Sequence, residues 1–175
     1  MRMIEAQPNK TKFIRHCIAK HSAETHELPK GFGEVIAAKR LMAESLPLFD
    51  ISVVAGFPIP LDNDEQAEDV SLTEILCPHP DASYLIRVQG NSMQDADIHH
   101  GDLIMVDKSK RNPSPKEVAM CELNGEYTIK RIEKRREKLF LVPANPDYPE
   151  MEVKDEDDFY VWGVVTYVIH APRKS

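Results

Sequence analysis

One serine and one lysine have the residue types needed for nucleophilic chemistry. Ser92 lies in Gly90-Asn-Ser-Met93, just after an apolar run over residues 84–88, and Lys130 lies inside a strand-like run over 126–132. A serine hydroxyl is a weak nucleophile until a base removes its proton, and lysine is such a base when apolar surroundings lower its pKa. The pair therefore predicts a Ser-Lys catalytic dyad.

Each residue also has an ordinary explanation. Lysine is rarely fully buried, so Lys130 alone is typical of a surface lysine on a hairpin, and Ser92 alone is typical of a polar turn. Strand alternation over 126–133 places Thr128, Lys130 and Ile132 on one face. A buried ammonium there would be costly and would tend to lose its proton, which favours the catalytic interpretation.

The turn around Ser92 has a second chemical use. A glycine in this loop lets successive backbone N–H groups point toward one position. The amides of Asn91 and Ser92 are therefore predicted to form an oxyanion hole, the feature that stabilises the charge developed during acyl transfer.

Composition limits the function classes. The chain has 175 residues and a net charge of -7, with a basic excess over residues 1–45 and an acidic remainder. An acidic body argues against broad, direct contact with a phosphate backbone, which favours a protein partner over direct DNA binding, while the basic head is only weakly suggestive of nucleic acid. The sequence shows neither an apolar run of about 20 residues nor a signal peptide, which predicts a cytoplasmic protein.

The cysteines and histidines predict no metal site and no cofactor. The three cysteines are widely spaced without a C-x-x-C pair, which is typical of free thiols in a reducing compartment. Cys77 with His79, and His99 with His100, lack the spacing of metal ligands. Cys121 lies in an expected strand and is predicted to be in the core.

The expected secondary structure changes along the chain. Helical periodicity predicts helices over 9–22 and 33–45, and the prolines over 46–60 predict an extended segment. From about residue 71 the pattern predicts a mostly β body, with Asn124-Gly125 as a type I′ hairpin turn. The expected strands are 83–89, 103–106, 117–123, 126–133, 138–142 and 159–169.

An ordered set of motifs from Gly56 onward resembles the UmuD/LexA family of self-cleaving proteins. The matching pieces are Ala55-Gly56, Gly90-Asn-Ser-Met93, Ile98, Gly101-Asp-Leu-Ile-Met-Val-Asp107, Gly125-Glu-Tyr-Thr-Ile-Lys-Arg131, Leu141-Val-Pro-Ala-Asn145 and Val161-Trp-Gly-Val-Val165. Single pieces such as Gly-Asp are unspecific, whereas their order over most of the chain is highly specific.

The resemblance implies a compact LexA/signal-peptidase-like β body in which Ser92 is the nucleophile and Lys130 the base. It implies that the Ala55-Gly56 bond is the chain's own substrate, and that a RecA–single-stranded DNA filament favours its cleavage. The domains expected are a helical N-terminal arm (1–45), a cleavage segment and linker (46–70), and a peptidase and dimerisation domain (71–175). A homodimer is also implied, and the strand 159–169 could help to form it.

Within this family the chain looks more like UmuD, an accessory subunit of an error-prone polymerase, than like a repressor. Leu46-Pro-Leu-Phe49, Gly56-Phe-Pro-Ile-Pro60 and His79-Pro-Asp-Ala-Ser-Tyr84 carry this likeness, and residues 1–45 are too short for a complete winged helix-turn-helix. We therefore expect a Y-family, UmuC-like polymerase as partner in SOS mutagenesis.

Two features depart from that pattern. The cleavage pair is Ala-Gly, as in LexA-like repressors, where the best-known UmuD has Cys-Gly, and the head of residues 1–45 is longer than the arm of that UmuD. The alternatives are therefore a LexA-like repressor inactivated by self-cleavage, and a β domain that binds a partner without catalysis.

Overall fold

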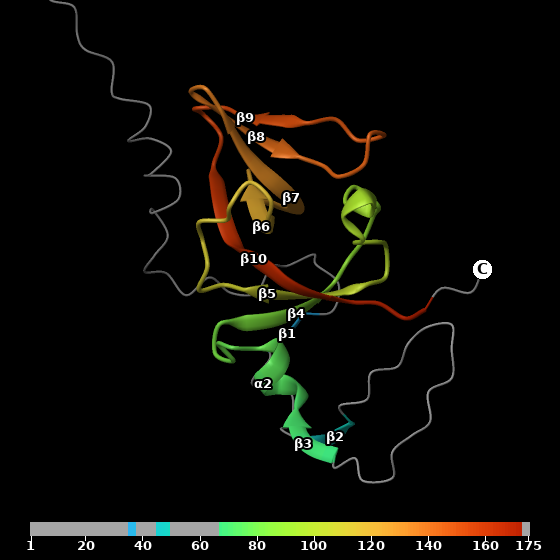
Figure 1. Cartoon of the computed structure of the whole chain (residues 1–175). Coiled ribbons are helices and arrows are strands. Elements are labelled where there is room, and N and C mark those ends of the chain that lie inside the picture. Colours follow the sequence, from blue (N-terminus) through green and yellow to red (C-terminus); the bar gives the residue numbers. More distant parts are fainter. Residues whose placement is uncertain (1–34, 38–44, 50–66, 173–175) are drawn as a thin grey trace, which may run out of the picture.

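The computed structural model describes residues 35–37, 45–49 and 67–172. Its body is one antiparallel sheet of eight strands in the order β1-β4-β5-β10-β6-β7-β8-β9 (Figure 1), which confirms the mostly β prediction. The bounds are β1 Val35–Ala37, β4 Ser83–Arg87, β5 Leu103–Asp107, β6 Val118–Leu123, β7 Glu126–Arg135, β8 Lys138–Val142, β9 Met151–Val153 and β10 Phe159–Ile169.

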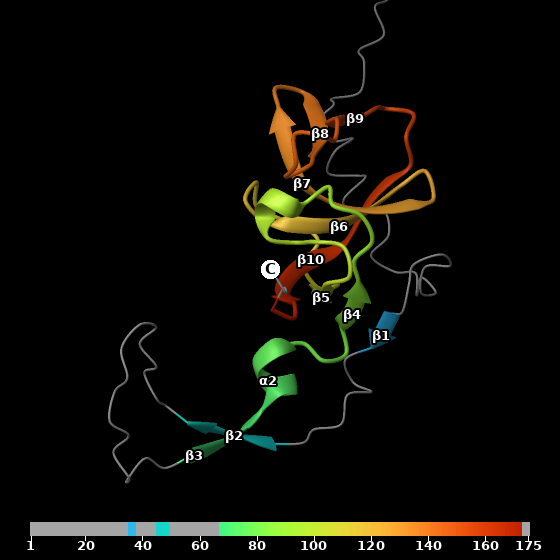
Figure 2. The same ribbon diagram turned by 90° about the vertical axis from the view of Figure 1, so that its right-hand side faces the viewer.

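A two-stranded ribbon lies apart from this sheet. It pairs β2, Ser45–Phe49, with β3, Ala67–Ser71, and the short helix α2, Leu72–Leu76, joins it to the body. Figures 1 and 2 both show the ribbon beyond α2, away from the eight-stranded sheet. Pro47 is tolerated in β2 because the ribbon has only two strands, both of which are edges.

The predicted helix over 33–45 is wrong at residues 35–37. Val35, Ile36 and Ala37 form β1, which pairs with Ile86, Leu85 and Tyr84 of β4. The other edge of β4 is occupied by β5, so its remaining edge offers unpaired N–H and C=O groups. Two β-branched residues suit that pairing better than a helix. The predicted helix over 9–22 lies outside the described residues.

The strand predictions in the body are confirmed with small shifts at their ends. Asn124 and Gly125 both have positive φ, 53° and 83°, as a type I′ turn requires. This turn sets the register of β6 against β7 and places Ala119 opposite Lys130. The strands β1, β3 and β9 were not predicted: β1 and β9 have only three residues each, and β3 lies in an acidic stretch without apolar alternation.

β10 is the central strand of the sheet. Its first half pairs with β6 and its second half with β5, and irregularities at Val161/Gly163 and Val165/Tyr167 bend it. Trp162 is fully buried in the main core, where it packs against Tyr84 with ring centroids 5.0 Å apart. β10 lies inside the sheet, and Tyr167 and Ile169 in its second half are exposed.

No helix among the described residues is long and apolar enough to cross a membrane. In the same residues no group of three or more His, Cys, Asp or Glu side chains is arranged to hold a metal ion. Cys77 and Cys121 are buried free thiols, which confirms the prediction that Cys121 lies in the core.

Candidate active site

The structure brings Ser92 and Lys130 together. Lys130 Nζ lies 2.8 Å from Ser92 Oγ, 2.9 Å from Thr128 Oγ1 and 3.0 Å from the Ile129 carbonyl oxygen. Lys130 and Thr128 come from the same face of β7, two residues apart, as the alternation predicted. Ser92 comes from the loop between β4 and the short 3-10 helix η2, Gln94–Ala96.

A neutral amine can satisfy these three contacts. An amine has two N–H donors and one lone pair, so it can donate to Thr128 and to the Ile129 carbonyl while it accepts the Ser92 hydroxyl proton. An ammonium instead donates all three bonds and leaves no lone pair for that proton. The arrangement therefore suits a base that faces its nucleophile.

Burial favours the neutral amine. Only 6% of Lys130 is exposed, and loss of hydration lowers its pKa below the ordinary value of 10.5. Of the described carboxylates, none forms an ion pair with Lys130. Burial also raises the pKa of the nearby Cys121 thiol to about 12, so at neutral pH it supplies no negative charge to hold an ammonium.

Ser92 is only partly buried, while the next residue anchors its loop. Met93 is 1% exposed and belongs to the main core beside Trp162. Gly90 has a φ of +89°, a conformation that residues with a Cβ rarely adopt, and its N–H donates to His100 Nδ1 at 3.2 Å. A buried methionine and a left-handed glycine thus hold the serine at the surface of the body.

The amides expected to form the oxyanion hole are available. Among the described residues, the backbone N–H groups of Asn91 and Ser92 donate to no acceptor. The side chain of Asn91 faces elsewhere, since its Oδ1 accepts a hydrogen bond from the His100 N–H at 3.1 Å. The predicted substrate, Ala55-Gly56, lies outside the described residues, in the segment that joins β2 to β3.

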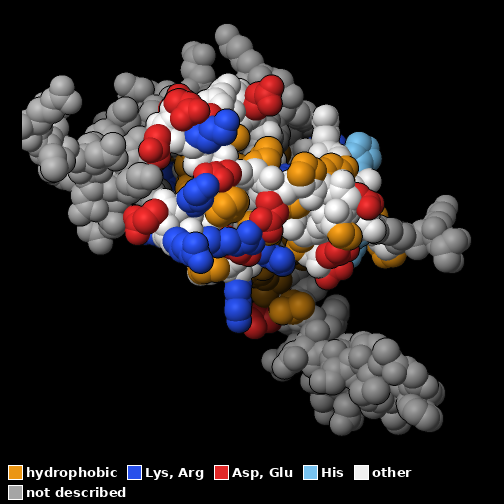
Figure 3. All heavy atoms as spheres, turned by 90° about the horizontal axis from the view of Figure 1, so that it is seen from above, with side chains coloured by type: hydrophobic (Ala, Val, Ile, Leu, Met, Phe, Trp, Pro, Cys, Tyr) orange, Lys and Arg blue, Asp and Glu red, His pale blue; other side chains and the backbone are white. Residues whose placement is uncertain are grey.

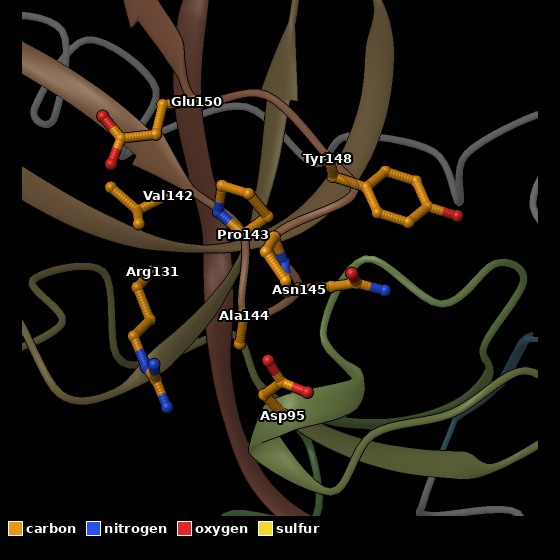
Figure 4. A pocket seen from close by; sticks show the side chains of 9 residues that line it. Asp95, Arg131, Val142, Pro143, Ala144, Asn145, Tyr148 and Glu150 are labelled. Carbon is orange, nitrogen blue, oxygen red and sulfur yellow. The ribbon is translucent and has the colours of Figure 1, made fainter.

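The sequence did not predict two hydrogen bonds that hold the loop carrying Ser92. Ala144 N donates to the Ser92 carbonyl at 2.9 Å, and Asn145 Nδ2 donates to the Asn91 carbonyl at 2.8 Å. Both residues lie in Leu141-Val-Pro-Ala-Asn145, which the sequence singled out without a role. The same connection between β8 and β9 borders an open pocket of about 370 Å³, whose lining includes Asp95, Asn145 and Arg131 (Figure 4).

Comparison with known proteins gives the family. The Peptidase S24-like family model matches residues 47–166. Protein SamA of Salmonella typhimurium is 34% identical over 129 residues, which cover 74% of this chain and 88% of SamA. Protein MucA of Escherichia coli is 37% identical over 124 residues, covering 70% of this chain and 83% of MucA.

A repressor is also similar. The LexA repressor of Xylella fastidiosa is 32% identical over 171 residues, which cover 98% of this chain and 75% of that repressor. The chain therefore belongs to the S24-like family of self-cleaving serine peptidases, and with SamA and MucA to its UmuD-type group of SOS mutagenesis proteins.

Proposed function

We propose that this chain cleaves its own Ala55-Gly56 bond, with Ser92 as nucleophile and Lys130 as general base. The observation that carries the proposal is the 2.8 Å contact between Lys130 Nζ and Ser92 Oγ, made by a lysine whose pKa is lowered by burial. Matching of the base's pKa to the working pH is what general-base catalysis needs.

The chemistry proceeds through an acyl-enzyme. The neutral Lys130 amine takes the Ser92 proton as Oγ attacks the Ala55 carbonyl carbon, and the oxyanion accepts hydrogen bonds from the Asn91 and Ser92 amides. Collapse breaks the carbon–nitrogen bond, and the Lys130 ammonium returns its proton to the departing Gly56 amine. Water then attacks the ester and loses a proton to Lys130. The Lys130 ammonium returns that proton to the departing Ser92 Oγ, which releases residues 1–55 as a free acid and restores the dyad.

The small residues at this bond suit the reaction. Ala55 has a side chain that a shallow site can accept, and Gly56 lets the backbone turn sharply on entering it. The site is on a body whose Ser92 remains partly exposed, so a segment of chain can reach the hydroxyl.

Cleavage is tested by intact mass. Purified chain is incubated at pH 7 and at about pH 10, alone and with RecA, ATP and single-stranded DNA, beside Ser92→Ala and Lys130→Ala. The expected result is a break between residues 55 and 56 that is faster at high pH and absent in both variants. The exposed Ser114→Ala is the matched control and is expected to cleave normally. An uncleaved wild-type chain under every condition would reject the peptidase role.

The proposed biological role is that of a cytoplasmic, dimeric accessory subunit. RecA bound to single-stranded DNA favours cleavage, and the 56–175 product binds a Y-family, UmuC-like polymerase during SOS mutagenesis. The similarity to SamA and MucA supports this role, and the free thiols of Cys77 and Cys121 suit a reducing compartment. Co-purification of the 56–175 product with such a polymerase is the test.

The charge distribution supports a protein partner. On the face shown in Figure 3, Lys and Arg side chains are interspersed with Asp and Glu. Arg135 contacts Glu133 and Glu150 at 2.7 and 2.5 Å, and Lys138 contacts Glu152 at 2.8 Å. Basic groups neutralised in this way give a weak field for a phosphate backbone.

A LexA-like repressor is the second candidate, because the similarity to that repressor covers 98% of the chain and so includes most of residues 1–45. It predicts sequence-specific, salt-dependent operator binding by the intact Ser92→Ala chain, which cannot remove its own head. Binding that does not discriminate operator from random duplex would exclude this candidate.

A further inference from the structure

The loop that carries Ser92 is held by its carbonyl groups. The Asn91 carbonyl accepts from Asn145 Nδ2 at 2.8 Å and from the Gln94 N–H at 3.2 Å. The Ser92 carbonyl accepts from the Ala144 N–H at 2.9 Å, and the Asp95 N–H donates to the Ala144 carbonyl at 2.7 Å. Two consecutive residues after β8 therefore fix two consecutive peptide groups of the loop.

The hydrogen bond from Asn145 fixes the peptide group between Asn91 and Ser92. The Asn91 carbonyl and the Ser92 N–H belong to the same planar trans peptide, in which the C=O and N–H bonds point in opposite directions. When Asn145 holds the carbonyl, the Ser92 N–H is directed away from Asn145. In the described part of the chain that N–H has no acceptor, so it is left for an incoming oxygen.

The amide of Asn145 is itself oriented. Its Oδ1 accepts the Asp147 N–H at 2.9 Å, which leaves Nδ2 to face the Asn91 carbonyl. The opposite orientation would place Oδ1 against that carbonyl oxygen and Nδ2 against the Asp147 N–H, giving two unfavourable contacts. Figure 4 shows Asn145 on the connection after β8, beside the helix η2 that carries Asp95.

We propose that Asn145 is a positioning residue for the oxyanion hole: its Nδ2 donor holds the Asn91–Ser92 peptide so that the Ser92 N–H faces the developing oxyanion. The proposal rests on the self-cleavage proposed above. It assigns a function to a side chain that, in the described residues, forms no hydrogen bond with Ser92 Oγ or Lys130 Nζ.

Packing offers no competing explanation for this residue. Asn145 is only partly buried and lines the open pocket of about 370 Å³, so its side chain fills no closed space. Asn145→Asp keeps the shape and the acceptor for the Asp147 N–H, but it replaces the donor to Asn91 with a carboxylate oxygen and adds a negative charge. Asn124→Asp is a control for added charge at a distant site: at the β6–β7 turn it also replaces an amide donor with a carboxylate oxygen, there against the Asp157 carboxylate.

The test is the self-cleavage rate of the full chain from pH 6 to pH 10.5, with hydrogen exchange of the peptide covering residues 89–97. Asn145→Asp is expected to lower the high-pH plateau by about 10- to 100-fold, less than complete removal of an oxyanion donor. In Asn145→Ser, which removes the donor without adding a charge near the site, the midpoint of the pH profile stays at the wild-type value, because Lys130 is unchanged. Hydrogen exchange of the 89–97 amides becomes faster. Asn124→Asp is expected to match the wild type in plateau rate, in the midpoint of the pH profile and in hydrogen exchange.

Asn145→Ser removes the donor without adding charge, so it gives the same result if the aspartate variant folds poorly. If the Asn145 variants have the same plateau cleavage rate and the same hydrogen exchange over residues 89–97 as Asn124→Asp, the proposal is overturned while self-cleavage itself still stands. A shifted midpoint in Asn145→Ser, which adds no charge, would also overturn it, since Asn145 would then act through the base. Absence of cleavage in the wild type would instead reject the proposed function, and the hydrogen exchange alone would still decide whether Asn145 holds the loop.

Discussion

Lys130 Nζ lies 2.8 Å from Ser92 Oγ, and both groups have the partners that a base and its nucleophile need. Thr128 and the Ile129 carbonyl take the two N–H bonds of a neutral amine, and the lone pair is left for the Ser92 proton. Burial of the lysine without a described carboxylate partner keeps that lone pair available at a lower pH than in water.

Removal of the amine is expected to abolish cleavage without unfolding the chain. Lys130→Met keeps an unbranched apolar stem of similar length and is expected to slow cleavage by about 10³-fold or more, in the range of a lost general base. Its unfolding temperature does not fall, because a buried ionisable group is replaced by an apolar one. Lys134→Met, at an exposed position of the same strand, is the control and cleaves at the wild-type rate.

Self-cleavage is expected to rise with pH. The reactive species is the neutral amine, so the rate increases through the folded-state pKa of Lys130 and reaches a plateau above it. Because burial lowers that pKa, the midpoint lies below 10.5. Rates measured from pH 6 to pH 11 by intact mass give the midpoint. A rate that rises only above pH 10.5 would show a lysine with ordinary hydration.

The lowered pKa of Lys130 is also expected to change the free energy of unfolding with pH, in a direction that can be worked out. Lys130 has a lower pKa in the folded chain than in the unfolded chain, so between those two values the unfolded chain binds more protons. The contribution of Lys130 to the free energy of unfolding therefore increases with pH across this window. Urea unfolding of Lys130→Met beside wild type isolates this contribution. The difference between their free energies of unfolding is expected to narrow as pH rises toward 10.5.

Thr128 is expected to raise the pKa of Lys130 and to orient its amine. Thr128→Val removes an acceptor that stabilises the ammonium more than the amine, so the Lys130 pKa and the midpoint of the pH profile move to lower pH. The plateau falls by about fivefold, equivalent to about 1 kcal/mol for one lost hydrogen bond that orients the amine. A midpoint that moves to higher pH would contradict this role.

Gly163 is expected to be intolerant of a side chain. A Cβ there would lie 2.7 Å from Val106 Cγ1 and 2.8 Å from the Asp107 carbonyl oxygen, next to the irregularity in β10. Gly163→Ala is expected to reduce the free energy of unfolding by about 2 kcal/mol, the usual range for overpacking. Gly101→Ala, where nothing lies within 4 Å but φ is +91°, is the comparison and loses less. Urea unfolding of both variants measures the difference.

The sequence determined the parts of this protein that depend on local pattern. Alternating residues and Asn124-Gly125 predicted β6, β7 and their turn, because side-chain period and positive φ are local properties. The face shared by Thr128 and Lys130 followed from the same alternation. The residues proposed for chemistry, Ser92 and Lys130, were recognised through ordered motifs that resemble a family.

Only the tertiary structure decided the contacts between distant segments. Ser92 and Lys130 are 38 residues apart, and their contact depends on β10 pairing with both β5 and β6 to bring the two halves of the sheet together. Asn145 meets Asn91 across 54 residues, with no periodic signal in either loop. β1 forms because the edge of β4 is unpaired. Such contacts are set by long-range pairing and burial, which outweigh local preference and are not encoded in any short window of sequence.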